Sequence, residues 1–179
     1  MNTAVATTPA APHMTPQAFL DELAPLALAS AKATGIPAGF VLAEGALESG
    51  WGNSALARLG CNLFGVKADP AWHGATLTME TGEVVKGARV AVDALWRRYS
   101  SWADCVDDHA QFFLRNPRYA AALKVCSGPA AGVSAAFAHA VAQAGYATDP
   151  EYAARIVAVI DSYDLTRYDL QLVPGTSAA

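Results

Sequence analysis

Two helix-start signals, each a polar capping residue followed by proline, set the strongest limit on how this chain can fold. Thr15-Pro16 precedes apolar residues at helical spacing, and Asp149-Pro150 precedes another such run near the other end. A side-chain oxygen at the cap and proline in the first turn both favour a helix start. Apolar spacing between further glycine and proline breaks predicts six or seven helices, over residues 16–34, 37–48, 54–59, 101–115, 118–125, 129–144 and 149–163.

One stretch in the middle departs from the helical pattern. Between Ala75 and Tyr99, threonine and valine come close to alternating with other residues, and glycines are spaced among them. This pattern is typical of a small antiparallel ribbon of two or three strands. We therefore expect an α+β fold, mainly α, in one domain over residues 15–170, with a disordered leader at 1–14 and a disordered tail at 171–179.

The composition narrows the functional classes. The 179 residues are 53% hydrophobic and only 16% charged, which excludes an intrinsically disordered chain. A net charge of −4 supplies no basic face, so no nucleic-acid partner is expected. No segment reaches the roughly 18 uninterrupted apolar residues of a membrane span, and we expect none.

The cysteines and histidines do not indicate a metal site. Cys61, Cys105 and Cys126 have no CxxC spacing, and the four histidines form no metal-binding motif, so neither a metal nor another cofactor is expected. An odd number of cysteines cannot all pair within one chain. Small buried thiols are favoured over the alternative of one disulfide and one free thiol.

Glu48 has the most suggestive position for chemistry. It ends an apolar helical run and is followed at once by Ser-Gly-Trp-Gly. A carboxyl at the inward end of a buried helix, beside a tryptophan, loses hydrating water, and desolvation raises the pKa of a carboxyl. A carboxyl that keeps its proton near neutral pH can act as a general acid on a leaving oxygen. Glu44, one helical turn earlier on the same face, is the competing candidate.

A second carboxylate is expected on the ribbon. Glu83 follows Gly82 near the predicted turn, where a mobile ribbon could bring it over a bound sugar, and Glu80 is the fallback. Sugar rings stack on aromatic faces, and Trp72 is the best surface candidate because it lies in a loop before the ribbon. Tyr146 follows Gly145 at a helix end, from which its hydroxyl could reach the same cleft or cap a neighbouring helix.

Several segments, in order along the chain, together resemble one known family. Residues 42–54 read LAEGALESGWGNS and residues 62–67 read NLFGVK, and this pair is the most specific part. The later matches are WHG at 72–74, TGEVVKG at 81–87, YSS at 99–101, NPRY at 116–119 and AGYATDPEY at 144–152. From about residue 15 to 165, the chain resembles glycoside hydrolase family 73, the N-acetylglucosaminidases of peptidoglycan.

The resemblance implies a lysozyme-like helical domain with a small β-lobe, and cleavage of the β-1,4 bond between N-acetylglucosamine and N-acetylmuramic acid. It assigns the general acid to Glu48, the second carboxylate to Glu83 and a cleft tyrosine to Tyr146. Val84 stands where the family often has tyrosine, so the register of the ribbon stays open between Glu83 and Glu80. The matched segments also supply the expected substrate-binding residues, which are Asn62, Phe64, Trp72 and Tyr119.

Two alternatives and several partners follow from the same resemblance. A lytic transglycosylase would use one glutamate and leave an anhydro sugar, whereas a cell-wall-binding module would leave no product. The expected partner is the glycan strand of peptidoglycan, with a cognate immunity protein, secretion components or flagellar rod components as further candidates. Residues 1–13 lack the basic and apolar regions of a secretory signal peptide. We therefore expect action in the periplasm or outside the cell, reached by flagellar export, type VI secretion or phage lysis.

Overall fold

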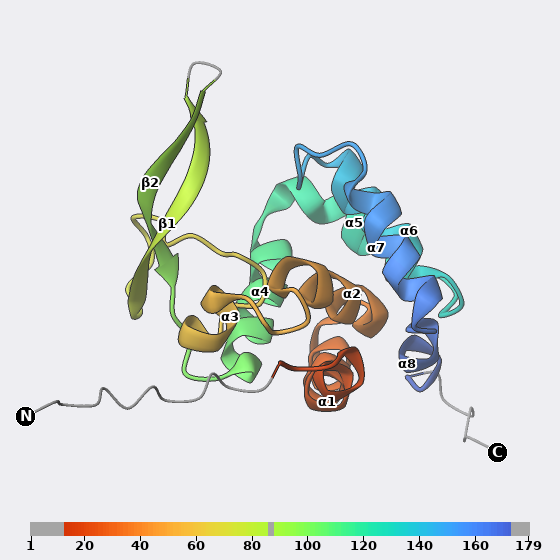
Figure 1. Cartoon of the computed structure of the whole chain (residues 1–179). Helices are drawn as coiled ribbons and strands as arrows, with labels where there is room; N and C mark the ends of the chain where they lie inside the picture. The colour runs from red at the N-terminus through yellow and green to blue at the C-terminus, as the bar shows by residue number, and fades with distance from the viewer. Residues whose placement is uncertain (1–12, 86–87, 173–179) are drawn as a thin grey trace, which may run out of the picture.

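The computed structural model describes residues 13–172 except 86–87, and within the strands it leaves out the side chains of 83–85 and 88–89. The expected leader and tail therefore lie almost wholly outside the described residues. Helices dominate, with one hairpin between the third and fourth of them (Figure 1). The elements are α1 (Pro16–Thr34), α2 (Ala38–Ser49), α3 (Ala55–Gly60), β1 (Thr76–Val85), β2 (Ala88–Arg97), α4 (Trp102–Arg115), the 3₁₀ turn η1 (Pro117–Tyr119), α5 (Ala120–Val125), α6 (Val133–Gln143), α7 (Tyr152–Ser162) and α8 (Thr166–Leu170).

Three of the predicted helices begin at a capping side chain. The side-chain oxygens of Thr15, Ser54 and Ser101 accept hydrogen bonds from the backbone N–H three residues on, at 3.2, 3.1 and 3.2 Å. Each bond satisfies one of the N–H groups that a helix start leaves without a partner. The Thr15-Pro16 prediction is thereby confirmed in detail.

The predicted boundaries are wrong toward the other end of the chain. Helix α6 begins at Val133 and not at Pro129, because Gly132 adopts a left-handed conformation with φ of 88° just before it. Helix α7 begins at Tyr152, because Asp149 uses its carboxylate in a local turn, accepting from Glu151 N at 2.9 Å. The short helix α8 was not predicted at all.

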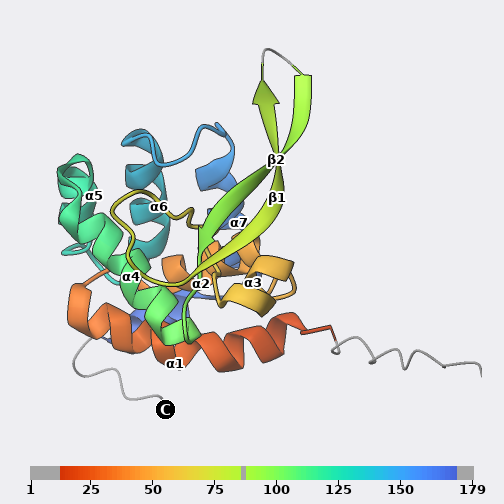
Figure 2. The ribbon, with the colours of Figure 1, turned by 90° about the vertical axis from the view of Figure 1, so that its left-hand side faces the viewer.

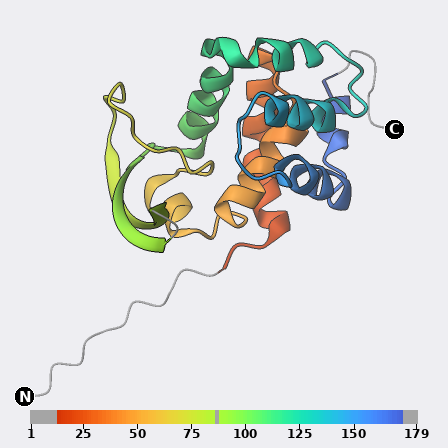
Figure 3. The same cartoon turned by 90° about the horizontal axis from the view of Figure 1, so that it is seen from above.

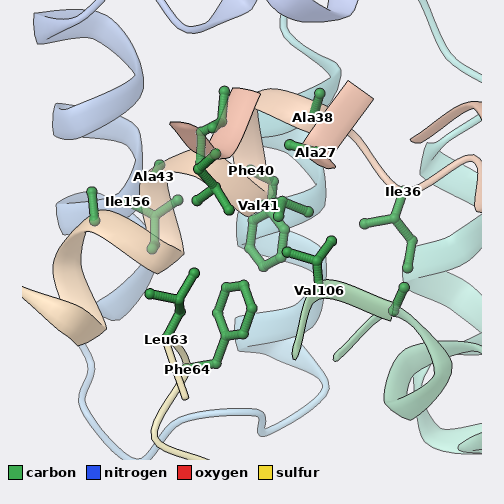
Figure 4. Packing of buried hydrophobic residues seen from close by; sticks show 14 of the residues in the cluster. Ala27, Ile36, Ala38, Phe40, Val41, Ala43, Leu63, Phe64, Val106 and Ile156 are labelled. Atoms are coloured by element: carbon green, nitrogen blue, oxygen red, sulfur yellow. The ribbon is translucent and has the colours of Figure 1, made fainter. Parts of the chain in front are cut away.

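The core of the helical body forms around α2, which contacts α1, α6, α7 and α8. Nearly every residue of α2 is buried, and most of them are apolar, so other parts of the domain enclose this helix. Figure 4 shows Phe40 and Val41 of α2 in one cluster with Phe64 and Val106. The Phe40 ring meets Phe137 of α6 edge-on, with 4.8 Å between centroids. A helix enclosed in this way gives its C-terminal residue a fixed position.

The two strands form one antiparallel hairpin that projects from the helical body (Figures 2 and 3). In its register, Thr76 faces Arg97, Glu80 faces Asp93 and Glu83 faces Val90. Its base is fixed by Arg97, which donates to both oxygens of Asp108 on α4, at 3.0 and 2.8 Å, and to Asp69 at 2.7 Å.

The fold class predicted from the sequence is confirmed: the domain is mainly α, with a two-stranded antiparallel β-lobe. No helix in the described part of the chain has the length and apolar character needed to cross a membrane. Cys61, Cys105 and Cys126 all carry free thiols, and Cys105 is fully buried. Burial raises the pKa of the Cys105 thiol to about 12, so it is an inert core group.

Candidate active site

A cavity of about 320 Å³ opens at the C-terminal end of α2. Its walls come from α2, the loop at 64–66, α4, the loop at 146–147 and the start of α7. The residues that line it are Glu44, Glu48, Phe64, Gly65, Val66, His109, Phe112, Tyr146, Ala147 and Tyr152. The structure thus brings three of the predicted site residues together here, namely Glu48, Phe64 and Tyr146.

The turn after Glu48 is built by the motif that follows it. Gly50 and Gly52 adopt left-handed conformations, with φ of 57° and 76°. A Cβ on Gly52 would also lie 3.1 to 3.2 Å from Met14, Phe19 and Trp102. Both the backbone conformation and these close contacts therefore disfavour a side chain there. The Ser49 hydroxyl accepts from Gly52 N at 2.7 Å and closes the turn. These contacts end α2 sharply and leave Glu48 at the cavity.

Trp51 does not form the wall beside Glu48 that the sequence suggested. Its ring packs between Phe19 and Tyr163, at 5.7 and 4.5 Å between centroids, and it is absent from the cavity lining. The aromatic walls are Phe64, Tyr146 and Tyr152 instead. Trp51 therefore fixes the turn from behind, and residues remote in the sequence enclose the carboxyl.

The pKa of the Glu48 carboxyl is raised above its ordinary value. Desolvation by the surrounding protein is the largest cause, repulsion from Glu44 adds to it, and attraction from Arg155 opposes both. The residue as a whole is exposed and lines the cavity, and the surrounding protein still removes enough water from its carboxyl to raise the pKa. A raised pKa in an open pocket is the condition for a carboxylic acid that reaches a substrate while still protonated.

Directly behind Glu48, Glu44 forms the centre of a buried polar cluster. The residue is 1% exposed, and its Oε1 accepts a hydrogen bond from the Tyr152 hydroxyl at 2.9 Å. Its Oε2 lies 2.9 Å from Nε2 of His109, which is 2% exposed. The two atoms lie within ion-pair distance, and Glu44 Oε2 accepts no hydrogen bond from the residues that the structure describes. The buried carboxylate is thus compensated by groups from α4 and α7.

Aromatic rings hold this cluster in place. Phe64 stacks on the His109 ring with 3.8 Å between centroids and 9° between planes. The Tyr146 hydroxyl lies 3.4 Å from His109 Nε2, and burial followed by the charge of Glu44 raises the pKa of Tyr146 well above its ordinary value. Tyr146 therefore keeps its proton and can donate a hydrogen bond into the cavity.

Three predicted substrate-binding residues lie away from the cavity lining. Asn62 is buried and donates to Val66 O at 2.9 Å and Arg97 O at 2.8 Å, so it shapes the loop at 62–66. Trp72 lies at the hairpin base, with the Arg97 guanidinium 4.6 Å from its ring and Tyr99 beside it. Tyr119 is buried against Phe113, at 5.1 Å between centroids. Their substrate-binding role stays a prediction.

The candidate second carboxylates lie on the hairpin. Glu83 occupies a position near the end of β1, opposite Val90, and its side chain is outside the described residues. Glu80 is exposed and faces Asp93 across the ribbon. Among the described residues, the carboxylates that line the cavity are those of Glu44 and Glu48.

Sequence reasoning considered Glu44 but missed its partners. His109 stands in the sequence only as one of four histidines without a metal-binding motif, and Tyr152 only as the last residue of a matched segment. The available signal was a histidine at an apolar position of α4, between Val106 and Phe113. A buried histidine in such a position needs a polar partner, and buried Glu44 needs one as well.

The comparisons with known proteins agree with this geometry. Residues 24–165 match the glucosaminidase family model, described as mannosyl-glycoprotein endo-β-N-acetylglucosaminidase. The exo-glucosaminidase LytG of Bacillus subtilis is 40% identical over 158 residues, which are 86% of this chain and 53% of LytG. The peptidoglycan hydrolase FlgJ of Vibrio parahaemolyticus is 37% identical over 147 residues, 80% of this chain and 46% of FlgJ. The chain therefore spans about half the length of these curated relatives.

Solved structures show the same fold. The glycoside hydrolase domain of Salmonella typhimurium FlgJ superposes with a TM-score of 0.70 at 34% identity, covering 84% of this chain and 98% of that one. The catalytic domain of the autolysin Auto from Listeria monocytogenes gives a TM-score of 0.76 at 28% identity, covering 92% and 91%. The family model matches most of the length of this chain. The chain therefore belongs to the glucosaminidase family of glycoside hydrolases.

Proposed function

We propose that the protein hydrolyses the β-1,4 bond between N-acetylglucosamine and N-acetylmuramic acid in peptidoglycan, with Glu48 as general acid. The single observation that carries the proposal is the position of Glu48, which lines the cavity of about 320 Å³ and has a carboxyl with a raised pKa. The substrate follows from the relatives, because LytG is named a glucosaminidase and FlgJ a peptidoglycan hydrolase. Both names describe those proteins, and their substrate comes to this chain as part of the proposal.

In the proposed first step, protonated Glu48 donates its proton to the glycosidic oxygen while the bond from that oxygen to the sugar C1 breaks. Positive charge develops at C1 and the ring oxygen as the leaving sugar departs. Tyr146, which keeps its proton, donates a hydrogen bond to a substrate oxygen in the same cavity. The Glu44–His109 pair supports both side chains from within the cavity wall.

The proposed second step adds water at C1. With Glu83 as the base, the water attacks from the opposite face, its proton passes to Glu83 and the anomeric configuration inverts. With the substrate N-acetyl oxygen as internal nucleophile, a cyclic intermediate forms first, water then opens it, and the configuration is retained. Proton NMR of the first-formed product distinguishes the two, since it reads the anomeric configuration directly.

One observation favours a second candidate function, that of a lytic transglycosylase. The described carboxylates at the cavity are confined to α2, and such an enzyme needs only one acid. It leaves a 1,6-anhydro sugar, whereas hydrolysis leaves a reducing end that incorporates one water. Mass spectrometry of the released muropeptides separates the two products by the mass of that water.

The setting of the reaction is also part of the proposal. Because relatives such as FlgJ act on the wall, we place this activity in the periplasm or outside the cell. Flagellar rod or secretion components, or a cognate immunity protein that covers the cavity, remain the predicted protein partners. Expression directed to the periplasm of a host cell tests the setting, with lysis expected there and none after cytoplasmic expression.

The decisive experiment replaces Glu48 with glutamine. Loss of a general acid lowers the rate by roughly 10²- to 10⁴-fold, so Glu48→Gln should stop the clearing of purified cell walls while the thermal unfolding midpoint stays unchanged. Glu22→Gln, an exposed glutamate on α1, is the matched control and should clear walls at the wild-type rate. Full activity of the Glu48→Gln protein would refute the assignment of the acid.

A further inference from the structure

A second cavity, of about 330 Å³, lies beside the first along α4. Phe112 lines both of them, so its side chain separates the two cavities. The wall of the second cavity beyond Phe112 is built by Arg97, Asp108, Gln111, Arg115 and Asn116, with Pro117. A glycan strand is a linear chain, and a strand bound across Glu48 has to leave the first cavity somewhere. Because Phe112 borders both cavities, we expect the strand to continue into the second one.

Phe112 is unusual among the aromatic residues here because it is 41% exposed. It nevertheless has a fixed base, since its ring contacts Phe113 and Tyr119 at 5.5 Å and Tyr146 at 5.9 Å between centroids. Packing that fixes an exposed aromatic ring removes the entropy cost of ordering it when a ligand binds. A held, exposed ring between two cavities is suited to stacking on the apolar face of a sugar.

Among the charged side chains of the second cavity, one cation is available to bind a ligand. Arg97 donates to Asp108 and Asp69, and Oδ2 of Asp108 also accepts from the Tyr99 hydroxyl at 2.6 Å. Arg115, at the last turn of α4, is exposed and has no ion pair among the residues that the structure describes. Its guanidinium can bind a carboxylate through two parallel hydrogen bonds.

We propose that the second cavity is a sugar subsite for an acidic glycan, in which Phe112 stacks on the ring and Arg115 binds a carboxylate carried by that sugar. This inference rests on the proposed function, because the glycan in the subsite is the one whose neighbouring bond is cleaved at Glu48. In peptidoglycan the carboxylate belongs to the lactyl group of a peptide-free muramic acid or to the attached peptide. A chitooligosaccharide has the same ring and N-acetyl group and no carboxylate.

The test measures binding in the Glu48→Gln background, so that it does not depend on catalysis. Three ligands are titrated by isothermal calorimetry: chitohexaose, glycan strands freed of peptide by an amidase, and solubilised strands that keep their peptides. Arg115→Gln should weaken binding of an acidic ligand about tenfold and leave chitohexaose within twofold, as expected for one lost charge-assisted contact. An effect on peptide-free strands assigns the carboxylate to the lactyl group, and an effect confined to peptide-bearing strands assigns it to the peptide.

The second variant tests the stacking ring. Phe112→Ala should weaken binding of all three ligands about tenfold, and Phe112→Tyr should restore it, because tyrosine keeps the aromatic face. Arg58→Gln, an exposed arginine on α3, is the matched control and should change no affinity. Unchanged affinities in both Arg115→Gln and Phe112→Ala, or equal losses on acidic and neutral ligands for Arg115→Gln, overturn the subsite. Absence of hydrolysis by the wild type overturns the proposed function alone.

Discussion

The helical body and the β-hairpin hold their carboxylates in opposite ways. In the body, Glu44 and Glu48 lie on a helix that four other helices contact, and partners from α4 and α7 fix Glu44. In the hairpin, the two strands pair only with each other over most of their length, and Leu95 of β2 is 52% exposed. A two-stranded ribbon without a packed face is marginally stable by itself.

This difference between the body and the hairpin shows which contacts determine the position of each carboxylate. Glu48 is placed by packing that surrounds its whole helix, so no single contact outside α2 determines its position. The ribbon depends on its base, where Arg97 and Tyr99 both bind Asp108 and where Asn62 holds the Arg97 carbonyl. A change at the base is therefore expected to shift the whole hairpin and to leave Glu48 in place.

The largest effect is expected in the body. His109→Ala removes the partner of a carboxylate that is 1% exposed and empties the space between Phe64 and Phe40. Leaving a buried polar group without its partner costs about 1–3 kcal/mol, and the cavity left by the ring adds to this, so we expect a loss of about 3–5 kcal/mol of unfolding free energy. Urea unfolding measures this loss. His139→Ala, an exposed histidine on α6, is the control and should stay within about 0.5 kcal/mol of wild type. A loss below about 1 kcal/mol in His109→Ala would show that the pair does not stabilise the body.

A smaller and more local effect is expected at the hairpin base. Asp108→Asn weakens the bonds from Arg97 and Tyr99, at a cost of about 2 kcal/mol for charge-assisted contacts. Amide hydrogen exchange should therefore speed up in β1 and β2 and stay unchanged in α2. Asp107→Asn, its exposed neighbour, is the control. Equal acceleration in α2 and the strands would contradict the view of the hairpin as a separately held element.

The same contrast explains what the sequence could predict of the fold. Helix starts at Thr15, Ser54 and Ser101 were predictable because a capping bond spans three residues and needs nothing from the rest of the chain. The signal at Asp149 was of the same kind, but the helix start that it predicted was wrong. The carboxylate of Asp149 closes a turn before the helix instead. The same local chemistry permits either a helix cap or a turn before the helix, and the packing of α7 determines which one forms.

The site was predictable to the extent that it is local. Glu48 stands out because an apolar helix and two glycines surround it in the sequence itself. The Glu44–His109–Tyr152 cluster joins three helices, and no local pattern predicts which buried polar groups of separate helices will meet. Trp51 shows the converse error, because a neighbour in sequence packs against Phe19 and Tyr163, away from the carboxyl.

The pH dependence of activity tests which region controls the reaction. A general acid acts in its protonated form, so activity falls as pH rises through the pKa of Glu48. The charge of Arg155 lowers that pKa, so Arg155→Gln should move the alkaline limb of the kcat/KM profile to higher pH. Glu44 raises the same pKa by repulsion, so Glu44→Gln should move the limb to lower pH. Arg167→Gln on α8 serves as the control. An alkaline limb that neither change moves would belong to a group other than Glu48 and would contradict its assignment as the acid.

The smallest effect is expected midway along the hairpin, where Glu80 faces Asp93. Both side chains are exposed, and like charges directly opposite each other destabilise a strand pair by about 0.2–1 kcal/mol. Glu80→Gln should therefore slow amide exchange in the strands by about twofold, an effect near 0.5 kcal/mol, with the unfolding midpoint of the body unchanged.

The double variant shows whether repulsion is the cause. Glu80→Gln and Asp93→Asn each remove the same unfavourable pair, so both changes together should slow exchange no more than either does alone. Additive effects would mean that each residue acts through its own strand and not across the ribbon. The non-additive result would establish that this hairpin is weakened by its own charges, which makes the Arg97–Asp108 contact at its base the more important for holding it against the helical body.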